Sequence, residues 1–169
     1  MNTGKTKTAF LAQAALIAAF YVVLTYISAA FNLASGAIQV RISEALTIMP
    51  YFTAAGIPGV TLGCFLANLL LGSPWPDVVF GTLATLLGAL GSYALRKNRF
   101  LVSLPPVISN AIIVPLVLRY AYGTPGALWF FAVTVAAGEI ITCVIMGQIL
   151  ITALLPFRYK AFGENADKK

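Results

Sequence analysis

The chain contains no histidine, and only five of its 169 residues are acidic. Histidine is the most frequent general base and a common zinc ligand, so its absence argues against catalysis through an imidazole and against an ordinary zinc site. A nucleotide-binding loop is also missing, because Gly4, Lys5 and Thr6 lack the upstream glycine of a phosphate-binding loop. We therefore expect no enzyme and no protein that binds ATP itself.

Cysteine is rarer still than the acidic residues. Cys64 and Cys143 are the two cysteines, and both lie in apolar runs. Neither their number nor their spacing matches a disulfide framework or a metal-binding motif. We expect two small buried apolar side chains, no metal and no cofactor.

Apolar residues dominate the remainder, at 60% of the sequence against 9% charged residues. Several apolar runs approach the roughly 20 residues that cross a bilayer as a helix, and these runs lack the polar stripe of a soluble core helix. The composition predicts an all-α integral membrane protein with one domain over residues 1–169 and six transmembrane helices. The expected helices span about residues 8–30, 42–53, 58–71, 78–95, 101–120 and 126–155.

The net charge of +6 is distributed as a topology signal rather than as a nucleic-acid-binding surface. Basic residues gather at the two termini and in the loop at 96–99, as the positive-inside rule expects of cytoplasmic segments. We predict that both termini are cytoplasmic, which agrees with six crossings. The first apolar run, at 8–31, is too long for a signal peptide and predicts an uncleaved first helix.

A short polar stretch interrupts this apolar sequence at residues 39–50 and carries Arg41 and Glu44. An ionised side chain at the centre of a membrane helix costs about 2.5–3.5 kcal/mol, so such residues usually have a function. The spacing of three would allow the two charges to neutralise one another on one helical face. Pro50 makes the second helix short and interrupted, which is typical of a membrane binding site. The pair therefore indicates either a ligand site or a structural brace.

Further polar residues are predicted in the outer half of the bundle with this pair. Glu139 lies about 20 Å along the sixth helix from its outer end, at a rise of about 1.5 Å per residue. Asp77 begins the fourth helix, where a carboxylate would also cap free backbone amides. Such an outward-facing pocket suits a small, cationic or donor-rich ligand. The predicted set is Arg41, Glu44, Asn68, Asp77, Asn110 and Glu139.

The first helix carries two rows of alanine at four-residue spacing, Ala14 with Ala18 and Ala15 with Ala19. Small residues at this spacing let helix backbones approach closely in lipid. The spacing is compatible with packing inside the chain and with packing against another subunit. The following segment, 31–40, is expected to form a loop that covers the site.

Three stretches resemble the QueT family: Ile38 to Thr47, Ile57 to Asn68 and Asp77 to Leu86. Members of that family are the substrate-binding S-components of energy-coupling factor (ECF) transporters for queuosine precursors. The resemblance implies capture of a 7-deazaguanine, such as queuine or 7-aminomethyl-7-deazaguanine, at the outer face of a bacterial plasma membrane. It also implies docking to a membrane T subunit driven by two ATPases, with the alanines of the first helix at the contact.

The implied ligand presents two adjacent donors on its Watson–Crick edge, which a carboxylate accepts in bidentate fashion. Under the resemblance, Glu139 or Glu44 would bind this edge. Asp77 would bind an aminomethyl cation. Arg41 would take part in binding, or would brace the covering loop together with Glu44.

The ring carbonyl of such a ligand needs an amide donor, for which Gln39, Asn68 and Asn110 are the candidates. Its aromatic faces would stack on Tyr51 or Trp75. Two other functions fit the same composition: an S-component for another vitamin-like molecule and a stand-alone oligomeric transporter. A membrane enzyme or assembly factor with acid–base carboxylates is a third alternative.

Overall fold

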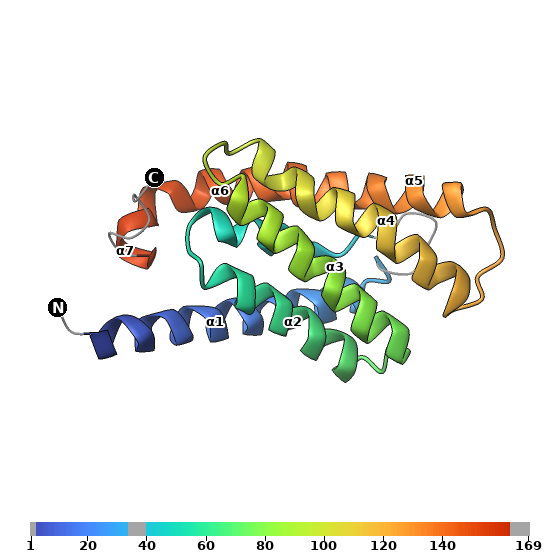
Figure 1. The fold of residues 1–169 in the computed structure, drawn as a ribbon, viewed down its shortest axis with the longest axis horizontal. Coiled ribbons are helices and arrows are strands. Elements are labelled where there is room, and N and C mark those ends of the chain that lie inside the picture. The colour runs from blue at the N-terminus through green and yellow to red at the C-terminus, as the bar shows by residue number, and fades with distance from the viewer. Residues whose placement is uncertain (1–2, 34–39, 163–169) are drawn as a thin grey trace.

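The computed structural model describes residues 3–33 and 40–162, and within these ranges the chain folds into helices joined by short turns (Figure 1). The prediction of an all-α fold is confirmed for this part of the chain. The α-helices are α1 (Thr3–Ala30), α2 (Gly56–Leu70), α3 (Trp75–Ala94), α4 (Leu104–Tyr120), α5 (Leu128–Glu139), α6 (Gly147–Leu154) and α7 (Arg158–Phe162). The other helical segments are the 3-10 helices η1 (Ile42–Tyr51), η2 (Leu101–Ser103) and η4 (Leu155–Phe157) and the π-helical stretch η3 (Ile140–Met146).

Within residues 3–33 and 40–162, four helical runs are long and apolar enough to cross a membrane. Each has at least 18 residues, close to the roughly 20 that span about 30 Å of hydrocarbon. Large apolar side chains cover the outside of these runs, as a lipid environment allows. The runs are Lys7–Ala30, Trp75–Ala94, Leu101–Tyr120 and Leu128–Phe157.

The shorter elements η1 and α2 form a hairpin inside the bundle. Residues 43–50 of η1 are all buried, and η1 packs against α1, α2, α3 and η3. A 3-10 helix of ten residues is unusual, because its hydrogen bonds are poorer than those of an α-helix. Burial within protein rather than lipid makes such a backbone tolerable at membrane depth. The irregular second helix predicted from Pro50 is thus observed as a protein-covered 3-10 helix.

Glycine permits the tight turn between η1 and α2. A Cβ atom at Gly56 would lie 2.6 Å from the backbone nitrogen of Pro50 and 2.7 Å from the carbonyl carbon of Met49. Both neighbours are backbone atoms, so they have little freedom to move away. Only glycine lets α2 begin this close to the end of η1.

The two alanine rows of α1 have different environments. Ala14 and Ala18 are buried, 6% and 7% exposed, and face Gly59 and Gly63 of α2. Ala15 and Ala19 are exposed. One row therefore packs within the chain, and the other row lies on the surface of the bundle.

The beginning of α1 and the short helix α7 lie at the same end of the bundle (Figure 1). Two contacts join them to each other and to the hairpin: Gln13 Nε2 donates to the carbonyl oxygen of Ala161 at 3.1 Å, and Phe52 stacks on Phe162. This arrangement agrees with the even number of crossings predicted from the charge pattern. That this end faces the cytoplasm remains a prediction.

Candidate functional site

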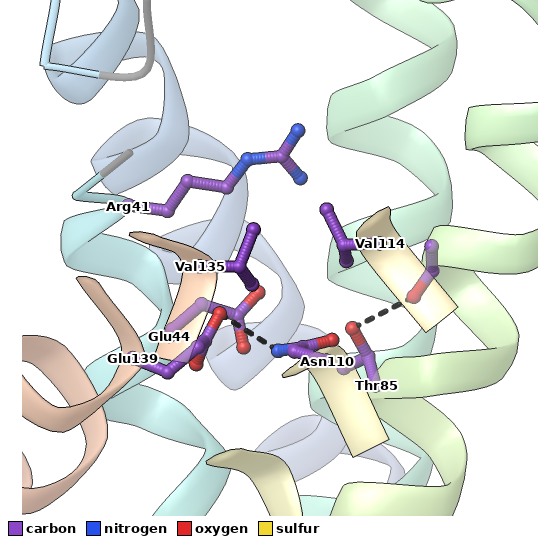
Figure 2. A pocket seen from close by; sticks show the side chains of 8 residues that line it. Arg41, Glu44, Thr85, Asn110, Val114, Val135 and Glu139 are labelled. Carbon is purple, nitrogen blue, oxygen red and sulfur yellow. Dashed lines mark hydrogen bonds between the residues drawn. The ribbon is translucent and has the colours of Figure 1, made fainter. Parts of the chain in front are cut away.

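A small polar cavity lies between η1, α3, α4 and α5 (Figure 2). Its volume is about 20 Å³, which is room for one water-sized occupant. Five of its eight lining residues are polar or charged, although the surrounding helices are apolar. The lining residues are Arg41, Glu44, Gly81, Thr85, Asn110, Val114, Val135 and Glu139.

Glu44 is the carboxylate that η1 contributes. It is only 3% exposed, and its Oε1 atom accepts a hydrogen bond from the hydroxyl of Tyr21, which is itself 1% exposed on α1. Oε2 has no hydrogen-bond partner in the described part of the chain. A buried carboxylate oxygen without a donor costs free energy, so this atom is available to a ligand.

Glu139 is the second carboxylate of the cavity and the last residue of α5. Its Oε1 atom accepts a hydrogen bond from Asn110 Nδ2 at 2.8 Å, and its Oε2 atom accepts one from the Cys143 thiol at 3.0 Å. The backbone changes from α-helix to the π-helical stretch η3 directly after Glu139. Such π-helical stretches frequently occur at functional sites, because they redirect side chains that a regular helix would place elsewhere.

Arg41 lines the cavity and is partly exposed. Its guanidinium lies 3.6 Å from Asp77 Oδ2 and donates to Asn68 Oδ1 at 3.5 Å. Tyr122, from the loop after α4, donates its hydroxyl to the same Asp77 oxygen at 2.8 Å. Three separate segments therefore meet at Asp77 above the cavity.

This pairing differs from the one expected from the sequence, in which Arg41 and Glu44 neutralise each other. The backbone of Arg41 is extended, at φ −94° and ψ 104°, because this residue precedes η1 and is not part of it. Its side chain therefore does not follow the helical face that carries Glu44. Asp77 makes no side-chain capping bond to α3, and it holds Arg41 and Tyr122 instead.

The groups at the mouth stay in the charge states that this network needs. Desolvation acts to lower the pKa of the Arg41 guanidinium, but Asp77 and the other acidic groups around it together outweigh this effect and leave that pKa above its ordinary value. Partial burial and the hydrogen bond to Asp77 raise the pKa of Tyr122 to about 12. The phenol therefore remains protonated and remains a donor at neutral pH.

The structure gathers most of the predicted ligand residues and separates a few. Tyr51 packs edge-on against Phe52 at the opposite end of η1 from Arg41, and Trp75 is 67% exposed. Neither lines the cavity. Gln39 and most of the expected covering loop lie outside the described residues. The predicted residues that line the cavity or lie next to it are Arg41, Glu44, Asn68, Asp77, Asn110 and Glu139.

The sequence interpretation missed four polar side chains of this site: Tyr21, Thr85, Tyr122 and Cys143. Tyr21 had the clearest signal, because tyrosine usually lies at the membrane interface and this one falls near the middle of a long apolar run. Cys143 lies one helical turn after Glu139, but a cysteine in an apolar run normally indicates packing.

Replacing Tyr21 with phenylalanine is expected to destabilise the empty protein by about 1–3 kcal/mol, because both oxygens of the buried Glu44 carboxylate then lack a donor. Thermal unfolding of the purified protein in detergent measures this change. Tyr26→Phe is the matched control, since Tyr26 lies on the same helix and is 42% exposed. The control should change the stability by no more than about 0.5 kcal/mol. Equal effects of the two substitutions would contradict the role assigned to Tyr21.

Comparison with known proteins identifies a family to which this chain is similar. Residues 11–156 match the family model described as QueT transporter. A curated relative from Lactococcus lactis subsp. cremoris, named "Queuosine precursor transporter QueT", is 39% identical over 83 residues. This alignment covers 49% of the chain and 48% of the relative, so the chain spans about half the length of the curated relative that it matches. No solved structure matches.

Proposed function

The chain belongs to the QueT transporter family and is a multi-pass membrane protein, and from these two premises we propose that it is the substrate-binding S-component of an ECF transporter for queuosine precursors. In this proposal the protein binds a 7-deazaguanine at the outer face of a bacterial plasma membrane. It does not catalyse a reaction. It delivers the ligand to a module that hydrolyses ATP.

One observation carries the substrate assignment: two buried carboxylates and one carboxamide converge on a single cavity (Figure 2). Glu44 and Glu139 come from segments far apart in the sequence, and Asn110 approaches from α4. Burying two carboxylates together is unfavourable unless something with donors or positive charge lies between them. The site is thus suited to a ligand that brings several N–H groups.

A 7-deazaguanine fits this requirement. Its ring N–H and exocyclic amine form an adjacent donor pair, which we assign to the carboxylate of Glu139, with Glu44 as the alternative acceptor. Asn110 can turn its amide toward the ring carbonyl once Glu139 has taken the ligand donors. Asp77 lies at the mouth, where it would receive the aminomethyl cation of 7-aminomethyl-7-deazaguanine in place of Arg41.

The observed cavity of about 20 Å³ is far smaller than the roughly 300 Å³ or more of a typical ligand pocket. Entry of a bicyclic ligand therefore requires the mouth to open. Arg41 is the group to move, because it lines the cavity, is partly exposed and immediately follows the segment expected to cover the site. Breaking its contacts with Asn68 and Asp77 would connect the cavity with the outside.

The proposed partners are a membrane T subunit and two ATPase subunits. Ala15 and Ala19 form an exposed row of small residues on α1, and we assign the contact with the T subunit to this row. Ala14 and Ala18 serve the internal contact with α2. With both chain termini on the cytoplasmic side, the cavity mouth faces outward.

Uptake of labelled 7-aminomethyl-7-deazaguanine by bacterial cells tests this proposal. We expect uptake when this chain is produced together with a T subunit and active ATPases. Uptake should fall to background when the ATPase active sites are inactivated. Full uptake with inactive ATPases would indicate a stand-alone transporter instead, and the assignment as an S-component would be wrong.

A further inference from the structure

The charges around the cavity do not balance among the described residues. Arg41 supplies one formal positive charge, whereas Asp77, Glu44 and Glu139 supply three negative charges. With all three carboxyl groups ionised, the region would carry a formal charge of −2, which is costly in a buried environment. Arg41 is already held by Asp77, so the two glutamates are the groups that lack compensation.

A thiol adjoins these two glutamates. The sulfur of Cys143 and one carboxylate oxygen each from Glu44 and Glu139 lie within 4.8 Å of one another. All three residues are buried, and Glu44 carries an Oε2 atom that has no hydrogen-bond partner in the described part of the chain. This oxygen belongs to a side chain that lines the cavity. The Glu44 carboxylate has an oxygen without a hydrogen-bond partner, and the Glu139 carboxylate and the Cys143 sulfur lie beside it. Because all three groups can coordinate a metal ion, the cluster points to a cation as ligand.

We propose that Glu44, Glu139 and Cys143 form a binding site for a soft divalent cation, of the class of Zn²⁺ or Cd²⁺. Such an ion would balance the formal charge of −2 while the thiol is neutral. With the thiolate it would bind more tightly, and the thiol proton would then pass to solvent. Glu44 and Glu139 both line the cavity, which holds one water-sized occupant, and the Cys143 thiol contacts Glu139 Oε2 at 3.0 Å.

The donor set also decides which ion fits. Zinc binds sulfur at about 2.3 Å and carboxylate oxygen at about 2.0–2.2 Å, which places tetrahedral ligands roughly 3.5 Å apart. Cys143 Sγ and Glu139 Oε2 are 3.0 Å apart, so modest movement brings the set to this geometry. Mg²⁺ and Ca²⁺ prefer oxygen ligands, six or more in number, and one thiol with two carboxylates does not satisfy them.

This cation site goes beyond the proposed transport function and is tested without a 7-deazaguanine. The full chain, purified in detergent without an affinity tag, is titrated with Cd²⁺ while the ultraviolet charge-transfer absorption of the cadmium–thiolate bond is recorded. The absence of histidine makes the result clear, because no imidazole competes for the ion. Cys143→Ser removes the soft ligand. Cys64→Ser is the matched control, since Cys64 is the other buried thiol and bonds to Asn68 rather than to a carboxylate.

We expect one equivalent of Cd²⁺ to produce the absorption band in the natural protein and in Cys64→Ser, and no band in Cys143→Ser. Glu44→Gln should weaken Cd²⁺ binding at least about tenfold, and Mg²⁺ should not compete. A natural protein without the band, or a band that persists in Cys143→Ser, would overturn the proposal.

A second measurement uses only the natural protein, so it does not depend on whether Cys143→Ser folds. Cd²⁺ should protect Cys143 of the natural protein from alkylation during partial unfolding, and mass spectrometry would locate the modified residues. Cys64 should react at the same rate with and without the ion. Equal protection of both thiols, or of neither, would also overturn the proposal.

Discussion

Replacing Glu139 with glutamine is expected to weaken the binding of a 7-deazaguanine by about 100-fold or more, equivalent to about 2.7 kcal/mol. The carboxylate is 8% exposed and lines the cavity. In our proposal it accepts two ligand donors, and an amide in its place offers one oxygen and turns an N–H group toward a second donor. A buried donor facing another donor costs more than a missing contact, because neither is solvated.

Asp77→Asn provides the comparison for this substitution, since it also converts a buried carboxylate into an amide. At the mouth of the cavity it should weaken binding of the aminomethyl ligand by about tenfold and leave binding of a 7-deazaguanine without the amine nearly unchanged. Isothermal titration with both ligands distinguishes the two sites. Equal losses for both ligands in both variants would show that the substitutions disturb the fold instead of separate contacts.

Replacing Gly63 with alanine is expected to have the largest effect on stability, about 2–3 kcal/mol, through overpacking. The added Cβ would lie 2.6 Å from Tyr21 Cβ and 3.1 Å from the Cα atom of Ala18. Both atoms are fixed to the backbone of α1, so α1 and α2 would have to separate. The separation would also draw Tyr21 away from Glu44, which couples a packing change to the binding site.

Thermal unfolding in detergent measures this loss, and ligand titration measures its consequence for binding. Leu62→Ala is the control, because Leu62 neighbours Gly63 on α2 but is 52% exposed toward the surrounding lipid. It changes more atoms than Gly63→Ala and should affect stability far less. Similar losses in the two variants would contradict the close contact between α1 and α2.

The all-helical fold could be predicted from the sequence because lipid leaves few alternatives. Apolar runs such as 8–30 and 101–120 must form helices when no water satisfies their backbone groups. The predicted boundaries at Ala30 and Tyr120 are those observed. Pro50 also correctly predicted that the second helix is irregular. Its 3-10 geometry depends on the packing of η1 against several neighbouring elements, and a local pattern does not contain that information.

The sequence predicted which types of residue form the candidate site, but it did not predict which of these side chains contact one another. Buried carboxylates stand out in an apolar sequence, and Glu44 and Glu139 were identified on that ground. Their meeting point depends on the register of η1 against η3, which no local spacing reveals. For the same reason the sequence suggested no metal ligands: positions 44, 139 and 143 have no motif spacing, yet their side chains meet.

Arg41 shows the same limit. Spacing along a helix paired it with Glu44, but the residue lies before the helix begins, and its extended backbone directs the side chain to Asp77. A charged residue at an element boundary is therefore a weak basis for predicting a partner. Tyr122 could not be connected with this pair from the sequence, since 45 residues separate it from Asp77.

Isothermal titration of the purified natural protein with 7-aminomethyl-7-deazaguanine, queuine and guanine tests the central claim most directly. The claim is that the buried carboxylates of Glu44 and Glu139 bind the donor edge of a 7-deazaguanine. We expect sub-micromolar binding of at least one 7-deazaguanine, weaker binding of guanine, and loss of the tight binding in Glu139→Gln. No binding of any of the three compounds, or tight binding that is unchanged in Glu139→Gln, would contradict the account.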